Sequence, residues 1–138
     1  MMQPLDKNTL FSIFESGDEE IYKEHSLEDA LKNPYVLMGM VLNGLQSYIL
    51  MDVMYKRNYP QEYERVSASI KYKYYSRIYS YLTRINSDSF ETIYTIGSSY
   101  ERDDVFKGLD EMRLYFESVE EYEKCNVIKK YIKLLTEL

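Results

Sequence analysis

The sequence contains few of the residues that carry metal or redox chemistry. Its 138 residues include one cysteine, one histidine and no tryptophan. A single cysteine cannot form an intramolecular disulfide, and the N-terminal residues lack the pattern of a secretory signal, so we expect a cytoplasmic protein. His25 has no second histidine and no cysteine cluster near it, so the sequence predicts no metal site.

Motifs of the common enzyme classes are also missing. The chain has no glycine-rich phosphate loop, no G-x-S-x-G nucleophile elbow and no Glu-x-x-His pair of the kind that builds di-iron bundles. Its acidic clusters lie near expected helix starts, where carboxylates favour the helix dipole. Cys125 falls on the apolar side of its helix, which indicates a small core residue. We therefore predict a protein that is not an enzyme and has no cofactor and no small-molecule substrate.

Glycine and proline are scarce, and two of the three prolines fall where helices are expected to begin. Pro34 follows Asn33, and Pro60 follows a break in the apolar pattern at residues 56–59. No sustained alternation of apolar and polar residues predicts a strand. These features predict an all-α protein, a compact bundle of about five to seven helices in a single domain over residues 1–138.

The expected helices divide the chain into four parts. Short helices are predicted within residues 1–33, one of them after a start at Ser26 that resembles a capping box. Two long central helices follow, then a short helix that Gly97 closes, and a terminal hairpin. The predicted ranges are 6–16 for the first short helix, 34–57 and 60–85 for the long helices, 87–96 within the connecting segment 86–108, and 109–138 for the hairpin.

The first long helix contains an apolar run over residues 35–55 that is long enough to cross a membrane. Asp52 interrupts the run, and a carboxylate in lipid would cost about 2.5 to 3.5 kcal/mol. We therefore predict no membrane contact and a helix that is buried nearly all round at the centre of the bundle. Its methionines are expected to fill an irregular core.

The second long helix is rich in tyrosine and in basic residues. Tyr72, Tyr75 and Tyr79 lie opposite its predicted core stripe, which consists of Tyr63, Val66, Ile70, Tyr74, Ile78, Tyr81 and Ile85. Tyrosine suits half-buried surfaces and interfaces, and aromatic rings beside bases can stack on nucleobases. Three interpretations of this tyrosine face stay open: a second layer of the bundle covers it, a protein partner binds it, or a nucleic acid does.

Charge is unevenly distributed along the chain. The net charge of −6 argues against a general nucleic-acid coat. Within this acidic protein, residues 56–85 carry seven bases and two acids, while the segments on both sides are acidic. The favoured interpretation is pairing of charges between neighbouring helices, and the alternative is a ligand-binding patch.

The C-terminal segment carries the most specific pattern of the chain. Residues 119–135 read VEEYEKCNVIKKYIKLL, and eight residues define the pattern: Glu120, Glu121, Tyr122, Glu123, Lys124, Ile128, Lys129 and Ile132. The segment resembles the UVR motif, a helical hairpin with which excision-repair subunits B and C dock onto other proteins. This resemblance implies binding of a protein and not catalysis.

We therefore predict a non-catalytic interaction or adaptor protein that docks a protein partner, or a second copy of itself, through the terminal hairpin. Its composition is typical of phage and mobile-element proteins. The predicted partner-binding residues are Glu120, Glu121, Tyr122, Glu123, Val127, Tyr131 and Leu134.

Two alternative functions stay open. One is a structural subunit of a larger assembly. The other is a regulator that binds nucleic acid through Lys71, Tyr72, Lys73, Tyr75, Arg77, Tyr79 and Arg84.

Overall fold

The computed structural model describes residues 30–138, so the helices predicted within residues 1–29, and His25, lie outside the described residues. Over residues 30–138 the chain forms helices and no strand, which confirms the predicted all-α class. The elements are the 3-10 turn η1 (Ala30–Lys32) and the helices α2 (Pro34–Asn58), α3 (Pro60–Thr83), α4 (Phe90–Ser99), α5 (Arg102–Ser118) and α6 (Tyr122–Thr136).

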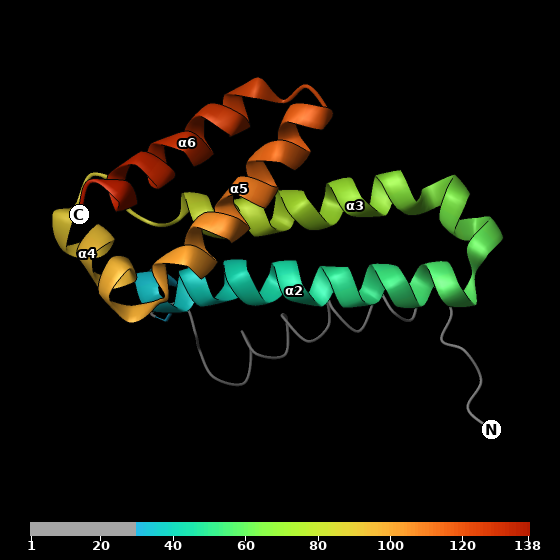
Figure 1. Cartoon of the computed structure of the whole chain (residues 1–138), viewed down its shortest axis with the longest axis horizontal. Helices are drawn as coiled ribbons and strands as arrows, with labels where there is room; N and C mark the ends of the chain where they lie inside the picture. The colour runs from blue at the N-terminus through green and yellow to red at the C-terminus, as the bar shows by residue number, and fades with distance from the viewer. Residues whose placement is uncertain (1–29) are drawn as a thin grey trace.

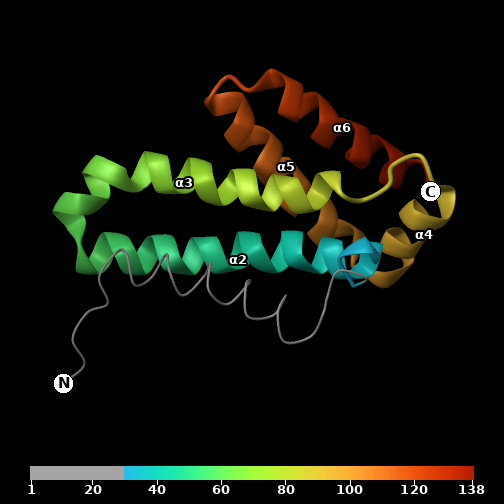
Figure 2. The same ribbon diagram turned by 180° about the vertical axis from the view of Figure 1, so that it is seen from behind.

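The helices form two layers (Figure 1). α2 and α3 run antiparallel as one long hairpin, and α5 and α6 form a second hairpin that packs across it. α4 lies at one end, where it contacts α2 and α6. Both views show that the second hairpin covers only the half of the first that lies nearer to α4 (Figures 1 and 2). The half around the α2–α3 turn has no other described helix over it.

Two helices begin where the sequence predicts a start. The Asn33 side chain accepts a hydrogen bond of 2.8 Å from the Tyr35 N–H, and Pro34 occupies the first turn of α2. Pro60 opens α3 in the same way. Ser89 accepts a hydrogen bond of 3.3 Å from the Thr92 N–H at the start of α4. The Asn33 and Ser89 side chains each satisfy an N–H group that would otherwise lack a partner, whereas no side chain caps α3.

Three predicted boundaries of the C-terminal half are wrong. α4 begins at Phe90 and not at residue 87. α4 does not end before Gly97 but continues through it to Ser99. The side chain of Leu138 lies so close to Gly97 that a Cβ atom there would clash with it, so this glycine serves close packing and not a helix end. α5 begins at Arg102, before the predicted hairpin boundary at residue 109.

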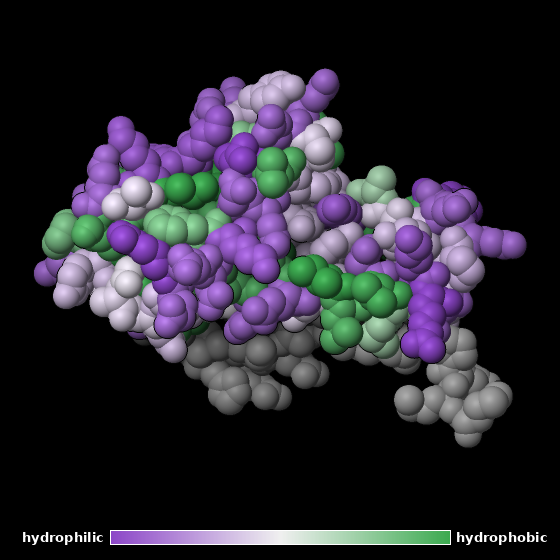
Figure 3. Space-filling model, viewed as in Figure 1, coloured by the Kyte–Doolittle hydropathy of each residue, from purple (hydrophilic) through white to green (hydrophobic). Residues whose placement is uncertain are grey.

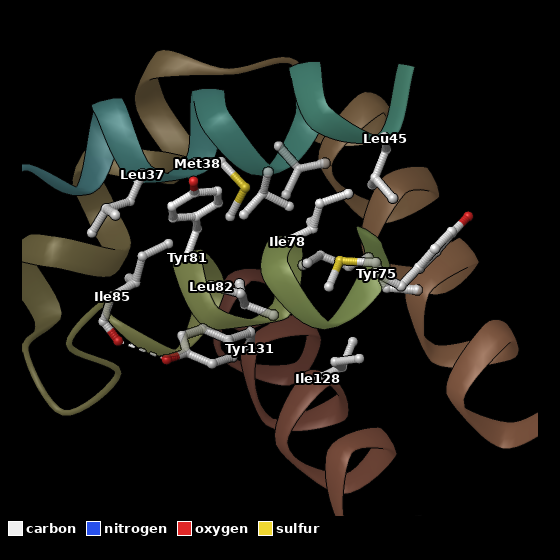
Figure 4. Packing of buried hydrophobic residues seen from close by; sticks show 14 of the residues in the cluster. Leu37, Met38, Leu45, Tyr75, Ile78, Tyr81, Leu82, Ile85, Ile128 and Tyr131 are labelled. Carbon is white, nitrogen blue, oxygen red and sulfur yellow. Dashed lines mark hydrogen bonds between the residues drawn. The ribbon is translucent and has the colours of Figure 1, made fainter. Parts of the chain in front are cut away.

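One hydrophobic core lies between the layers, with contributions from all five helices (Figure 4). Ile78 and Leu82 of α3 and Ile128 of α6 are fully buried. The Tyr131 hydroxyl donates a hydrogen bond of 2.6 Å to the Ile85 carbonyl and thereby ties α6 to the end of the first hairpin. Of the predicted α3 stripe, the C-terminal part is buried and the N-terminal part is half-buried. The reason is that the second hairpin does not reach the N-terminal part.

The expectation that α2 is buried nearly all round is wrong. One face packs on the core through Leu37, Met38 and Val41, whereas Leu50 and Val53 are 62% and 58% exposed. Only 28% of its most apolar window is buried, because a second layer covers α2 on one side and along half its length. With a mean hydropathy of 1.4 over that window, α2 has the length and composition of a membrane span, as core helices of soluble proteins also can.

The methionines of α2 differ in burial accordingly. Met38 is fully buried, and Met40 and Met51 pack against the core from partly buried positions. Met54, beyond the reach of the second hairpin, is 36% exposed. The predicted filling of the core by methionine therefore holds for the part of α2 under the second layer.

The turn between α5 and α6 is a Schellman motif with glutamate at the position that glycine usually occupies. Glu120 has a φ angle of 61°. Its N–H donates to the Glu117 carbonyl at 3.1 Å, and the Glu121 N–H donates to the Phe116 carbonyl at 2.9 Å. A side chain in this left-handed conformation costs free energy that glycine does not pay.

We expect Glu120→Gly to be more stable than Glu120→Ala by about 1 kcal/mol, because only glycine adopts the left-handed conformation without strain. Both variants remove the same carboxylate, so their comparison isolates the backbone. Urea unfolding of the two proteins measures the difference. Equal midpoints would contradict the assigned turn.

We expect Ile128→Ala to destabilise the protein by about 2 to 5 kcal/mol, the usual loss for truncation of a fully buried isoleucine. Ile132→Ala makes the same chemical change at a position that is only partly buried against the core, so its loss should be smaller. Denaturant unfolding of both variants tests the order. A larger loss for Ile132→Ala would show that the core-facing side of α6 is wrongly assigned.

Candidate docking site at the tip of the α5–α6 hairpin

The second hairpin is positioned by the tyrosine face of α3. The Tyr75 ring is buried, with its centroid 4.3 Å from that of Tyr115 and 6.4 Å from that of Phe116. The half-buried Tyr79 packs on Phe116 at 5.5 Å. A second layer of the protein itself thus lies over this face: it buries Tyr75 and half-buries Tyr79, whereas Tyr72 stays 38% exposed.

Two lysines lie over the rings of this aromatic layer. The Lys71 ammonium lies 6.0, 5.8 and 5.2 Å from the ring centroids of Tyr48, Tyr75 and Tyr115. Lys124 of α6 lies similarly over Tyr72, Tyr79 and Phe116, at 5.4, 5.5 and 5.2 Å. Each cation–π contact of this kind contributes about 0.5 to 1 kcal/mol at an exposed site. The lysines therefore join helices of both layers.

Glu121 fastens the tip of the hairpin to α3. Its carboxylate accepts a short hydrogen bond from the Tyr72 hydroxyl and lies 2.6 Å from the Lys124 ammonium. The Lys124 hydrogen bond, with that of Tyr72, holds the pKa of Glu121 below its usual range. Burial alone would lower the pKa of Lys124, but the hydrogen bond and the negative charge of Glu121, together with Tyr72, outweigh burial and raise that pKa. We call Tyr72, Glu121 and Lys124 the latch.

Most of the residues that were predicted to bind nucleic acid interact with other residues of the same chain. Lys71 lies over three tyrosine rings, and the Arg77 Nε donates to the Tyr81 hydroxyl at 3.4 Å. Lys73 and Arg84 are exposed and interact with other residues of the chain. Because Tyr75 is buried beneath the hairpin, it cannot stack on a nucleobase unless the hairpin moves away.

The tip of the hairpin exposes apolar side chains. Tyr122 is 58% exposed, Leu114 51% and Val119 39%. Apolar groups of this size gathered at one end of a domain are typical of a surface that another molecule covers. We call these three residues, with Glu117, Glu120 and Glu123, the tip surface.

The carboxylates of the tip surface are only partly neutralised. Arg113 lies 3.0 Å from Glu117 and 2.8 Å from Asp110, so it already serves two acids. Glu120 and Glu123 are exposed and form no ion pair with any residue of the described range. The tip surface therefore combines exposed apolar groups with the carboxylates of Glu120 and Glu123, which no base among residues 30–138 neutralises.

The structure separates the predicted partner-binding residues into two groups. Glu120, Tyr122 and Glu123 lie exposed at the tip, beside the latch residue Glu121. Val127 and Leu134 are half-buried against the core, and Tyr131 is only 4% exposed. The wide apolar arc of α6 is thus largely covered by the body of the protein, and we leave its residues out of the tip surface.

Sequence reasoning missed Leu114 and Val119. Leu114 lies off the apolar stripe of α5, whose buried members include Val105, Leu109 and Met112. Leu114 could have been found from the sequence, because it is an apolar residue at a position that the helix period assigns to solvent. Val119 is the C-cap residue of α5, and no periodic pattern assigns its face.

Other features of the described residues do not form a comparable site. No cluster of three or more His, Cys, Asp or Glu side chains among residues 30–138 is arranged to hold a metal ion. A pocket of about 300 Å³ lies between α4, α5 and the end of α6. Beside it, the Arg102 guanidinium donates to the Leu135 and Thr136 carbonyls at 2.9 and 3.4 Å. Arg102 thereby joins the start of α5 to the end of α6.

The lone cysteine is not part of a reactive site in the described structure. Cys125 is buried, as predicted, and its sulfur lies 3.4 Å from the Arg113 carbonyl oxygen in the neighbouring helix. Burial of this kind makes a thiol a packing group.

No protein-family model, curated protein or solved structure matches the chain. The geometry and the charge of the tip surface are therefore the observations that bear on the function of the protein.

Glu121 gives the latch a pH dependence. Because its folded pKa is depressed, Glu121 stabilises the folded protein above its unfolded pKa of about 4.3, and this contribution disappears as the pH falls through the folded value. We expect Glu121→Gln to be less stable than the parent at neutral pH. The difference in the free energy of unfolding should become smaller as the pH falls. Denaturant midpoints across this pH range measure this difference. Glu123→Gln, which removes an exposed and unpaired carboxylate, is the control and should show no such change with pH.

Proposed function

We propose that this protein is a non-catalytic interaction protein that docks a protein partner through the tip surface of the α5–α6 hairpin. The observation that carries the proposal is the exposure of Tyr122, Leu114 and Val119 beside carboxylates that no base of the described chain neutralises. Exposed aromatic and aliphatic groups at one projecting end favour a binding role.

The tip surface is preorganised for binding. The Schellman turn fixes the backbone at Glu120, and the latch and the Lys124 contacts hold the start of α6 against α3. A rigid surface loses little conformational entropy on association, so more of the contact free energy appears as affinity. The backbone of the turn and the latch therefore contribute to docking by fixing the position of the tip surface.

The charge of the tip surface indicates the chemistry of the partner. Glu120 and Glu123 are exposed and lie within two residues of Tyr122 in the sequence, so a complementary surface would offer an apolar pocket for the ring with lysine or arginine at its rim. Such opposite charges speed association and suppress wrong partners. The buried ring would supply most of the affinity, because aromatic anchors dominate protein interfaces.

The resemblance of residues 119–135 to the UVR motif supports the same role. In that family a helical hairpin is the docking module. Here the residues of the pattern that lie at the tip are Glu120, Tyr122 and Glu123. An adaptor role follows if a second surface of the protein binds another molecule, and a structural role follows if the tip surface binds a second copy of this chain.

A photo-crosslinking amino acid in place of Leu114, an exposed residue of the tip surface, identifies what the tip surface contacts in host cells. With that partner purified, we expect Tyr122→Ala to lose about 1 to 4 kcal/mol of binding free energy, a rise of about 5-fold to 1,000-fold in Kd. Calorimetric titration measures this loss.

Phe90→Ala is the matched control, because Phe90 is an aromatic residue of α4 that is 73% exposed and lies outside the tip surface. It should leave the Kd unchanged. Equal affinity of the parent and of Tyr122→Ala for the cross-linked partner would contradict the proposal. A cross-link only between two copies of this chain would favour the structural role.

A further inference from the structure

The part of α2 that the second hairpin does not reach carries an exposed apolar face. Ile49, Leu50, Val53 and Met54 are 52%, 62%, 58% and 36% exposed. Figure 3 shows hydrophobic surface over this part of the molecule, beyond the crossing of α5. We call these four residues the α2 face.

The α2 face continues into a depression between α2 and α5. This pocket has a volume of about 320 Å³, and Leu42, Leu45 and Ile49 line its apolar side. At Gly108 of α5 the backbone comes close to α2, because a Cβ atom there would lie 2.8 Å from the Leu42 side chain. An apolar helix face that leads into a groove suits an amphipathic helical segment.

The small size of the α2 face decides which occupant fits it. Its four residues span about one and a half helical turns, or roughly 8 Å along the axis. A stable interface between separate proteins buries about 800 Å² on each partner, far more than four side chains provide. A segment tethered to the same chain needs less contact area, because the tether raises its effective concentration and removes most of the entropy cost of association.

The chain itself contains a segment of the right chemistry. Within residues 1–29, Leu10, Ile13 and Phe14 recur at spacings of three and four, the pattern of an amphipathic helix face. The segment carries eight acids and two bases. Lys56 and Arg57 are exposed at the end of α2 next to the α2 face and would attract those acids.

The segment is also long enough. Leu50 lies 16 residues beyond Pro34, or about 24 Å along the helix. Residues 15–29 would connect Phe14 to Ala30, and 15 residues can span up to about 50 Å. We propose that the segment of residues 1–29 docks on the α2 face through Leu10, Ile13 and Phe14, so that any other molecule that binds this face must first displace it.

Thiol labelling of the full-length chain tests this intramolecular docking. Leu50→Cys in a Cys125→Ala background places a single cysteine on the α2 face. We expect N-ethylmaleimide to react about tenfold or more faster with this cysteine when Leu10→Asp and Phe14→Asp are added, because two buried charges would release the segment.

Ser12→Asp and Ser16→Asp are the matched control, since they add the same charges at polar positions of the same segment, and they should leave the rate unchanged. A second reporter, Lys129→Cys on the exposed face of α6, should react at one rate in all backgrounds, which excludes global unfolding as the cause of faster labelling.

Equal labelling of the Leu50→Cys thiol in the parent, the Asp variant and the control would overturn the proposal. Protection that rises with protein concentration and ignores the Asp substitutions would assign the α2 face to a second copy instead. Protection that appears only when lipid vesicles are added would assign it to a membrane surface. Both results would overturn the proposal as well.

Discussion

The fold depends on the packing of the α5–α6 hairpin against the tyrosine face of α3. Burial of an aromatic ring removes about 150 to 250 Å² from water, and here Tyr75 packs against both Tyr115 and Phe116. Tyrosine suits this layer because its ring fills the interface. The crossing of the two hairpins follows from this contact, and so do the projection of the tip surface and the exposure of the α2 face.

Two lysine side chains contribute to that contact through cation–π interactions. Lys71 and Lys124 each lie over three aromatic rings at the border of the layer, so their charges remain near water while their stems cover apolar surface. Burial raises the pKa of Tyr75 to about 12, so its ring stays neutral under ordinary conditions. Most of the basic and tyrosine side chains of α3 therefore contact other residues of the protein. This arrangement favours a protein partner over a nucleic acid.

The sequence contains the local signals of this fold but not the relations between its layers. Asn33, Pro60 and Ser89 mark helix starts because capping is a contact within a few residues of the chain. The role of Gly97 could not be predicted, because the side chain that it makes room for, Leu138, is far away in sequence. Tyr122 and Tyr131 were both predicted to bind a partner, although nine residues of helix place them on opposite faces of α6. The docking of the hairpin decides that the face of Tyr131 is the buried one. The exposure of α2 was missed because its apolar run does not reveal how far the second layer extends.

The central claim is that the second hairpin covers the tyrosine face of α3. Nuclear Overhauser effects between aromatic protons of selectively labelled tyrosines test it most directly. The account predicts strong cross-peaks between the rings of Tyr75 and Tyr115, whose centroids lie 4.3 Å apart. If the Tyr75 ring showed contacts only to residues of α3 and to water, the two-layer arrangement would be contradicted.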